Sequence, residues 1–231
     1  KSFDSLDDSN IAAVIIEPIL GEGGYVPAPS SVLKMIRDWC TKTGVLLIFD
    51  EIQSGIGRTG KWFSYQHHGI VPDILTTAKG IASGLPLGAC ISTPKIMDQW
   101  TTGSHGGTYG GNPLSCVAGT ATLTVLEPLL KTIEELGNHA FLKLNTELND
   151  HPNIADIRGI GLMIGIEFID QNNKPDAKIV QYIRNQCLEK NLLLVSCGYH
   201  GNVIRLMPPL TITMDELNKG LDTFISICQQ L

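Results

Sequence analysis

Two short apolar segments that each end on a charged residue constrain the fold of this chain most. Val45–Phe49 leads into Asp50, and Ile74–Ala78 leads into Lys79. A continuous run of this kind is typical of a strand that is buried on both faces of a parallel sheet. Ligands bind open α/β sheets at the carboxyl ends of the strands, where both charged residues would lie. A ligand site and a buried Asp–Lys ion pair are both consistent with this spacing.

The first 150 residues are predicted to form a mainly parallel sheet with helices. A strand, a helix and a strand in succession build such a sheet. Ser30 or Ser31 would cap the first helix, Gly44 would end it, and the leucines of 123–130 would share one face of the second. The predicted strands are 11–16, 45–50, 74–78 and 88–92, and the helices are 30–43 and two over 114–150.

The pattern changes after Pro152 to that of a small α+β domain. We therefore predict two domains, a larger one over residues 1–150 and a smaller one over 151–231. The elements expected in the second are a strand-like segment at 157–169, a helix at 176–190, strands at 192–196 and 203–206, and a helix at 214–229.

Composition sets limits on the partners of the chain. Its 231 residues are 43% hydrophobic and carry a net charge of −6, which disfavours nucleic acid and anionic membranes as partners. No apolar run approaches the roughly 20 residues of a membrane span. The six cysteines form no CxxC pair, which indicates free thiols in a reducing compartment such as the cytoplasm and no zinc site.

The N-terminal residues 1–5 resemble neither a signal peptide nor a natural start, since they lack Met. We expect the chain to be the C-terminal part of something longer, and an upstream targeting segment would lie outside this sequence.

Two motifs suggest nucleotide binding but fail in their context. Gly55–Gly60 matches GxGxxG, but no amphipathic helix follows it, and the next acid is Asp73. Gly55–Lys61 nearly matches a P-loop, but Trp62 replaces the hydroxyl that would hold Mg²⁺. The pair His67-His68 lacks a second ligand pair at zinc-like spacing and indicates no metal site.

Taken together, these segments resemble the class III pyridoxal phosphate (PLP)-dependent aminotransferases of fold type I, and most closely the 4-aminobutyrate aminotransferases. The matching motifs run in family order: Glu17-Pro18-Ile19, Gly21-Glu22-Gly23-Gly24, Asp50-Glu51-Ile52-Gln53-Ser54-Gly55, Gly57-Arg58-Thr59-Gly60, Pro72-Asp73-Ile74, Lys79-Gly80, Gly84-Leu85-Pro86, Gly107-Thr108-Tyr109, Gly111-Asn112-Pro113, Arg158-Gly159, Gly161-Leu162, Ser196-Cys197-Gly198, Asn202-Val203-Ile204-Arg205 and Pro208-Pro209-Leu210. The resemblance implies the C-terminal half of a PLP-transferase large domain followed by a small α+β domain.

The resemblance also implies roles around the cofactor. Lys79 would bind PLP covalently and act as the general base, and Asp50 would keep the pyridine nitrogen protonated. Ile52 would pack on the ring, and Gln53 would hydrogen-bond its phenolic oxygen. Thr108 would bind the phosphate across the interface of a homodimer.

Two further residues would contact substrate. Arg205 would bind a substrate carboxylate, and Glu22 would pair with Arg205 when no α-carboxylate is present. Leu20 departs from the family, which often has Gln there, and this affects the donor assignment more than the cofactor. Glu17 is expected to be a structural loop carboxylate.

The resemblance predicts transfer of an amino group from an ω-amino donor such as 4-aminobutyrate to a 2-oxo acid such as 2-oxoglutarate or pyruvate. Ornithine, acetylornithine or diaminobutyrate as donor stays open, as do decarboxylating and aminomutase variants. The alternative of another class is a non-catalytic folded or dimerising fragment that lacks the N-terminal half of an enzyme.

Overall fold

The computed structural model of this chain describes residues 8–231, so the prediction for residues 1–5 lies outside the described part. Contacts divide the chain into two compact units, each described here by itself. The first comprises the segment up to Pro18 with Ala28–Ile56 and Lys61–Pro128. The second comprises Ile19–Pro27, Gly57–Gly60 and Leu129–Leu231.

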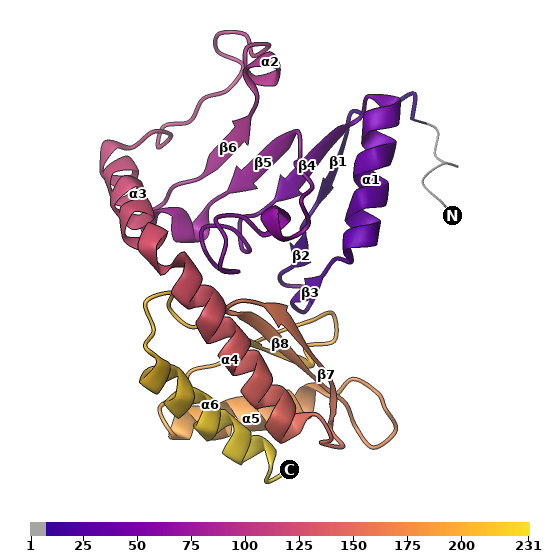
Figure 1. The fold of residues 1–231 in the computed structure, drawn as a ribbon, viewed down its shortest axis with the longest axis vertical. Coiled ribbons are helices and arrows are strands. Elements are labelled where there is room, and N and C mark those ends of the chain that lie inside the picture. Colours follow the sequence, from indigo (N-terminus) through magenta and orange to yellow (C-terminus); the bar gives the residue numbers. More distant parts are fainter. Residues whose placement is uncertain (1–7) are drawn as a thin grey trace. The chain divides into compact units, whose positions relative to one another are not determined.

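The first unit is built on a four-stranded sheet with the order β1-β4-β5-β6 (Figure 1). The strands β1, β4 and β5 are parallel, and β6 runs antiparallel to β5. This confirms the four strands and the mainly parallel sheet predicted from the sequence. Their bounds are β1 Ala13–Ile16, β4 Leu46–Asp50, β5 Ile74–Thr77 and β6 Ala89–Ser92.

Helix α1, Ser30–Thr43, packs on one face of this sheet and ends at Gly44 as predicted. Its apolar face meets the buried side chains of Leu47 and Phe49 from β4. The predicted serine cap is wrong, because the N-cap residue is Pro29 and makes no side-chain cap hydrogen bond. The Ser30 hydroxyl instead lies 2.7 Å from Nδ1 of His68.

Helix α3, Pro113–Leu126, begins at Asn112, whose side chain caps the amide of Ser115. Its buried face joins Leu126 to the small and polar residues Ser115, Gly119 and Thr122. The side chains of Leu114, Val117, Leu123 and Val125 are exposed. The leucine face predicted across 123–130 is present only in part, because Leu126 is buried but Leu123 is exposed, and Leu129 and Leu130 lie beyond the end of the helix. The α3 helix ends at Leu126, and a short 3₁₀ turn, η4 (Glu127–Leu129), separates it from helix α4 (Leu130–Leu148).

Helical residues 113–148 together are long and apolar enough to span a membrane by length and composition alone. Core helices of soluble proteins meet the same criterion, and charged residues such as Glu127, Lys131 and Glu134 interrupt the segment. This finding therefore carries no membrane assignment.

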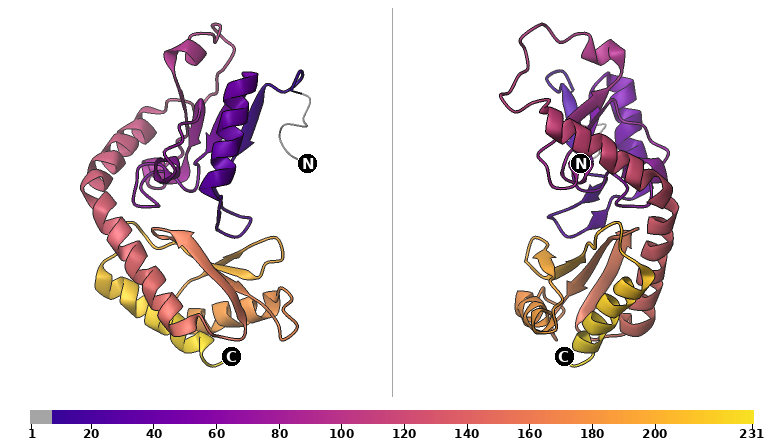
Figure 2. Two further views of the ribbon diagram at one scale, coloured as in Figure 1. Left: turned by 45° about the vertical axis from the view of Figure 1, so that its right-hand side comes forward. Right: turned by 90° about the vertical axis from the view of Figure 1, so that its left-hand side faces the viewer.

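The second unit is an antiparallel sheet with the order β7-β8-β10-β9, and helices α4 and α5 contact its strands (Figures 1 and 2). The segment predicted as one strand at 157–169 is a hairpin, which turns at Gly161. A side chain on Gly161 or Gly137 would collide with backbone atoms, so the hairpin packs tightly on α4. The bounds are α4 Leu130–Leu148, β7 Ile154–Ile160, β8 Met163–Phe168, α5 Ala177–Glu189, β9 Val195–Cys197, β10 Val203–Leu206 and α6 Met214–Cys228.

The boundary between the two units falls near residue 128, because helix α4 packs on β7 and α6 and so belongs to the second unit. This division does not coincide with the boundary predicted after residue 150, and the assignment of domains to 1–150 and 151–231 stays a prediction. The smaller elements are the hairpin β2 Ile19–Leu20 and β3 Val26–Pro27, the turns η2 Ser64–His67, η3 Lys79–Ala82 and η4 Glu127–Leu129, and the short helix α2 Pro94–Met97.

Candidate active site

Asp50 lies at the carboxyl end of β4, next to Thr76 of β5 in the parallel register. Its Oδ1 accepts a hydrogen bond of 3.0 Å from the amide of Ile52. Alternation along the strands places Asp50 and Thr76 on the face opposite α1, because the neighbouring Phe49 packs against that helix. The Thr76 hydroxyl is buried and has no hydrogen-bond partner among the described residues. Such an orphaned group beside an acid indicates a place for a polar ligand.

Lys79 follows β5 on the strand next to Asp50 and begins the turn η3. Its backbone φ is +47°, a conformation that costs a non-glycine residue energy and that gathers at functional sites. The turn contacts α3, where the Thr122 hydroxyl donates to Ser83 at 3.0 Å. Lys79 is exposed, and no ion pair joins it to Asp50 within residues 8–231. A buried Asp–Lys pair is therefore not what the structure shows.

Glu51, which the sequence analysis gave no role, anchors the segment that carries Ile52 and Gln53. Its carboxylate is fully buried. It accepts hydrogen bonds of 2.7 Å from each of the amides of Ser64 and Tyr65. Burial raises the pKa of Glu51, and these hydrogen bonds oppose that rise. Removing such a buried acceptor typically costs about 1–3 kcal/mol of stability.

Ile52 and Gln53, for which the family resemblance implies contacts with the cofactor ring, both lie half-buried in the turn after β4. Thr108 lies in the loop before α3 and is exposed. Its side chain makes no hydrogen bond with any residue of the described range. The structure thus brings Asp50, Ile52 and Gln53 together at the end of β4, with Lys79 just after the adjacent strand β5, whereas no hydrogen bond or ion pair within residues 8–231 joins Thr108 to them.

Glu22 and Arg205 form an ion pair within the second unit. Glu22 sits in the turn between β2 and β3, and Arg205 lies on β10. The Arg205 side chain is only 14% exposed, whereas that of Glu22 is 71% exposed. The predicted pairing of these two residues is therefore present, with the acid on the solvent side.

The Arg205 guanidinium has capacity for a further partner. Its Nε is buried without a hydrogen-bond partner among the described residues, and its Cζ lies 6.0 Å from the ring centre of Tyr25. Burial lowers the pKa of Arg205, but the hydrogen bond with Glu22 and the nearby Tyr25, Glu22 and Cys197 together outweigh burial and leave that pKa raised. Arg205 is therefore a fixed cation that could accept a second carboxylate through Nε.

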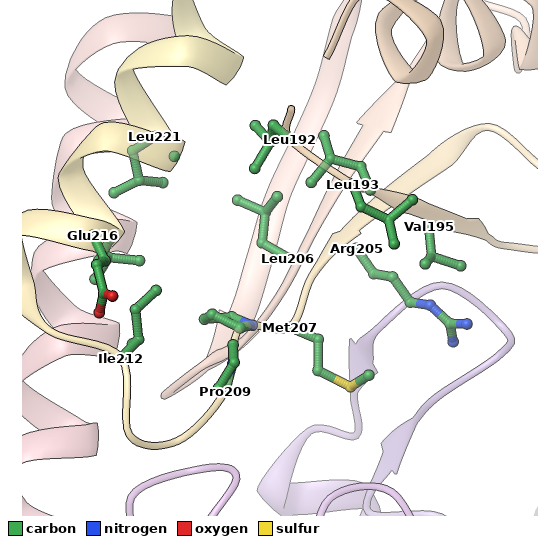
Figure 3. A pocket seen from close by; sticks show the side chains of 14 residues that line it. Leu192, Leu193, Val195, Arg205, Leu206, Met207, Pro209, Ile212, Glu216 and Leu221 are labelled. Carbon is green, nitrogen blue, oxygen red and sulfur yellow. The ribbon is translucent and has the colours of Figure 1, made fainter. Parts of the chain in front are cut away.

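An apolar cavity of about 290 Å³ lies on the other side of the Arg205 stem, between β9, β10 and α6. Figure 3 shows leucines such as Leu192 and Leu221 facing this cavity, while the guanidinium of Arg205 points away from them. The aliphatic part of the Arg205 side chain thus lines the cavity, whereas its guanidinium pairs with Glu22.

No group of three or more His, Cys, Asp or Glu side chains within residues 8–231 is arranged to hold a metal ion. The six cysteines are free, and four of them are buried. Burial raises the pKa of Cys197 to about 11, so that this thiol is a poor nucleophile at neutral pH.

The fold is that of an α/β protein in which Asp50 and Lys79 lie at the carboxyl edge of the parallel strands. The family model described as "Aminotransferase class-III" matches residues 1–228. The chain therefore belongs to the class III aminotransferase family, and its fold is that of the C-terminal half of a PLP-transferase large domain with a small α+β domain.

Individual relatives agree with this assignment. The chain is 41% identical to an acetylornithine aminotransferase of Clostridium acetobutylicum, over 96% of this chain and 57% of the relative. It is 42% identical to a 4-aminobutyrate aminotransferase of Escherichia coli K12, over 95% of this chain and 52% of the relative. The chain therefore spans about half the length of the curated relatives it matches.

Among solved structures, the chain resembles an ornithine aminotransferase of Toxoplasma gondii with a TM-score of 0.90 and 35% identity. The match covers 98% of this chain and 53% of the other. That structure is described as having partial occupancy of PLP at its active site.

Proposed function

We propose that the whole protein is a PLP-dependent aminotransferase and that this chain supplies its lysine, its ring-side acid and its substrate arginine. The residues at the strand ends fit the cofactor. An acid suits a basic ring nitrogen, and the buried Thr76 hydroxyl offers an unused polar group beside that acid. Lys79, with its strained backbone, lies just after the adjacent strand. Membership of the class III aminotransferase family supports transamination as the reaction.

When bound, PLP supplies an electron sink that stabilises negative charge on the reacting carbon of the substrate. Asp50 would keep a proton on the ring nitrogen, because an anion favours the charged form of a neighbouring base. Lys79 would hold the cofactor covalently and then move a proton at the reacting carbon as a general base. Ile52 would pack on the ring, and Gln53 would hydrogen-bond its phenolic oxygen.

The Glu22–Arg205 ion pair is the observation that carries the donor class. The enzyme must accept a donor with no carboxylate on the carbon that bears the reacting amine, and then a 2-oxo acid whose carboxylate lies next to the reacting carbon. A desolvated arginine without a counter-charge in either step would be costly. Glu22 is mostly exposed and can rotate away, whereas Arg205 is held with an unused Nε. This supports an ω-amino donor such as 4-aminobutyrate and a 2-oxo acid acceptor such as 2-oxoglutarate.

The second candidate function is transamination of a different ω-amino donor, which the names of other relatives suggest. Their names include acetylornithine and 5-aminovalerate aminotransferases, at 41% identity in both cases. All of these donors carry an amino group at the ω position, so the same gate serves each. Side-by-side rates with 4-aminobutyrate, ornithine, acetylornithine and diaminobutyrate would rank them.

Replacing Glu22 with Ala should shift the whole protein toward α-amino donors. A charged hydrogen bond is worth about 1.5–3 kcal/mol, so the ratio of kcat/KM for 4-aminobutyrate to that for L-glutamate should fall about tenfold or more. Glu189→Ala, at an exposed acid of α5, serves as the control. The proposal fails if the ratio in Glu22→Ala matches that of the control.

We also propose that the complete enzyme is a cytoplasmic homodimer. Thr108 is exposed and could reach a phosphate held by a second copy. Helix α3, which follows this loop, exposes apolar side chains such as Leu114 and Val117, each 67% exposed. Exposed apolar groups in a cluster indicate a surface that is covered in the assembled protein. Sedimentation of the whole protein tests this assembly, and a monomer at micromolar concentration would contradict it.

A further inference from the structure

The turn that carries Glu22 has an unusual backbone and needs external support. Between β2 and β3, the amides of Gly24 and Tyr25 both donate to the carbonyl of Gly21, at 3.1 and 3.3 Å. Gly24 has φ +123° and Tyr25 has φ +54°, and the latter costs energy in a residue with a side chain. Tyr25 is fully buried and contacts Met207 through its hydroxyl at 3.0 Å.

The side chain of Arg158, on strand β7, supports the backbone of this turn. Its Nε and Nη2 both donate to the carbonyl of Gly24, at 3.0 and 2.8 Å. The amide of Gly198 donates to the carbonyl of Glu22 at 2.9 Å. A Cβ on Gly24 would lie 3.0 Å from Nη2 of Arg158, so this guanidinium fills the space beside the turn. The backbone of Glu22 is thus held on both sides while its side chain stays exposed.

The charge of Arg158 is already balanced within the second unit. Its Nη1 pairs with Asp156 at 2.9 Å and with Glu167 at 2.6 Å, and its side chain is 14% exposed. Glu167 is held in turn by Nδ2 of Asn202 at 3.3 Å. The guanidinium of Arg158 therefore already bonds two carboxylates and a carbonyl, which argues against a role for Arg158 in binding a substrate carboxylate.

We propose that Arg158 is a specificity-positioning residue that fixes the backbone of the Glu22 turn, so that the pair with Arg205 opens and closes by rotation of the Glu22 side chain alone. The proposal rests on the proposed function, because it concerns the gate between ω-amino and α-amino substrates. A loose turn would let Glu22 spend time away from Arg205. Arg205 would then be open to α-carboxylates during the donor step, and discrimination between donors would fall.

Arg158→Lys tests this idea in the whole protein. Lysine keeps a charge beside Asp156 and Glu167 but lacks the planar fork that donates twice to Gly24. Loss of about one hydrogen bond predicts a threefold to tenfold fall in the kcat/KM ratio of 4-aminobutyrate to L-glutamate. The matched control is Arg184→Lys, since Arg184 also donates to a backbone carbonyl, that of Leu194 at 3.1 Å, but makes no hydrogen bond to the Glu22 turn within residues 8–231.

A double variant separates an effect through Glu22 from a general loss of stability. If Arg158 acts through Glu22, Arg158→Lys should add no further shift in a Glu22→Ala background. A lower melting temperature in Arg158→Lys with an unchanged kcat/KM ratio would overturn the proposal, because Arg158 would then contribute only to stability. If Arg158→Lys does not fold, Arg158→Gln combined with Glu167→Gln removes both charges together and is measured for the same ratio.

The two proposals fail in different ways. A shifted ratio in Glu22→Ala but not in Arg158→Lys or the double glutamine variant overturns the positioning role alone. An unchanged ratio in Glu22→Ala overturns the gate, and the role of Arg158 falls with it.

Discussion

Replacing Lys79 with Ala should lower transamination by the whole protein by about 10²–10⁴-fold, the usual contribution of a positioned general base. Lys79 begins the turn that directly follows β5, next to the strand that ends in Asp50, whereas Lys61 and Lys95 do not follow either strand directly. The backbone at position 79 has φ +47°, so circular dichroism should accompany the rate measurement to show that the fold persists.

Lys95→Ala is the matched control, since Lys95 is an exposed lysine of the same unit in the short helix α2. We expect its rate to equal that of the unmodified protein. A Lys79→Ala protein that is folded and retains more than about a tenth of the activity would remove Lys79 from the mechanism.

Asp50→Asn should lower transamination by at least about tenfold while leaving the fold intact, because a charged hydrogen bond is worth about 1.5–3 kcal/mol. The amide oxygen of asparagine can still accept the 3.0 Å hydrogen bond from Ile52, which preserves the turn after β4. What changes is the charge, so a bound ring nitrogen would lose its stabilised proton.

Asp98→Asn removes a carboxylate at an exposed position of the first unit and provides the comparison. Equal rates for Asp50→Asn and Asp98→Asn would show that the charge at position 50 has no electronic role.

The strands and most helices could be predicted because their signals are local. The apolar run before Asp50 is continuous since β4 is buried between neighbours, and its alternate residues meet α1. Thr213 and Glu216 form a capping box at the start of α6, close to the predicted residue 214. The candidate residues at the strand ends followed from the same local pattern together with the family resemblance.

Features that depend on distant partners could not be predicted in this way. The carboxylate of Glu51 meets amides 13 and 14 residues later, and Arg158 meets a carbonyl 134 residues away. The leucine face expected from Leu123 onward is present only at Leu126, because α3 ends there and buries Gly119 and Thr122 with it, and Gly119 has Leu87 as its close neighbour. The sequence indicates a role for Glu51 and Arg158 only in that each is a charged residue inside a family motif, and it does not show which distant groups they bond.

Peptide mapping after borohydride reduction with PLP tests the central claim most directly. The whole protein would be incubated with PLP, reduced, digested and analysed by mass spectrometry, with the loss of absorbance near 420 nm followed during reduction. We predict a single cofactor adduct on Lys79. An adduct on Lys61 or Lys95, or no adduct at all, would contradict the assignment, and the absence of any adduct would favour a non-catalytic module.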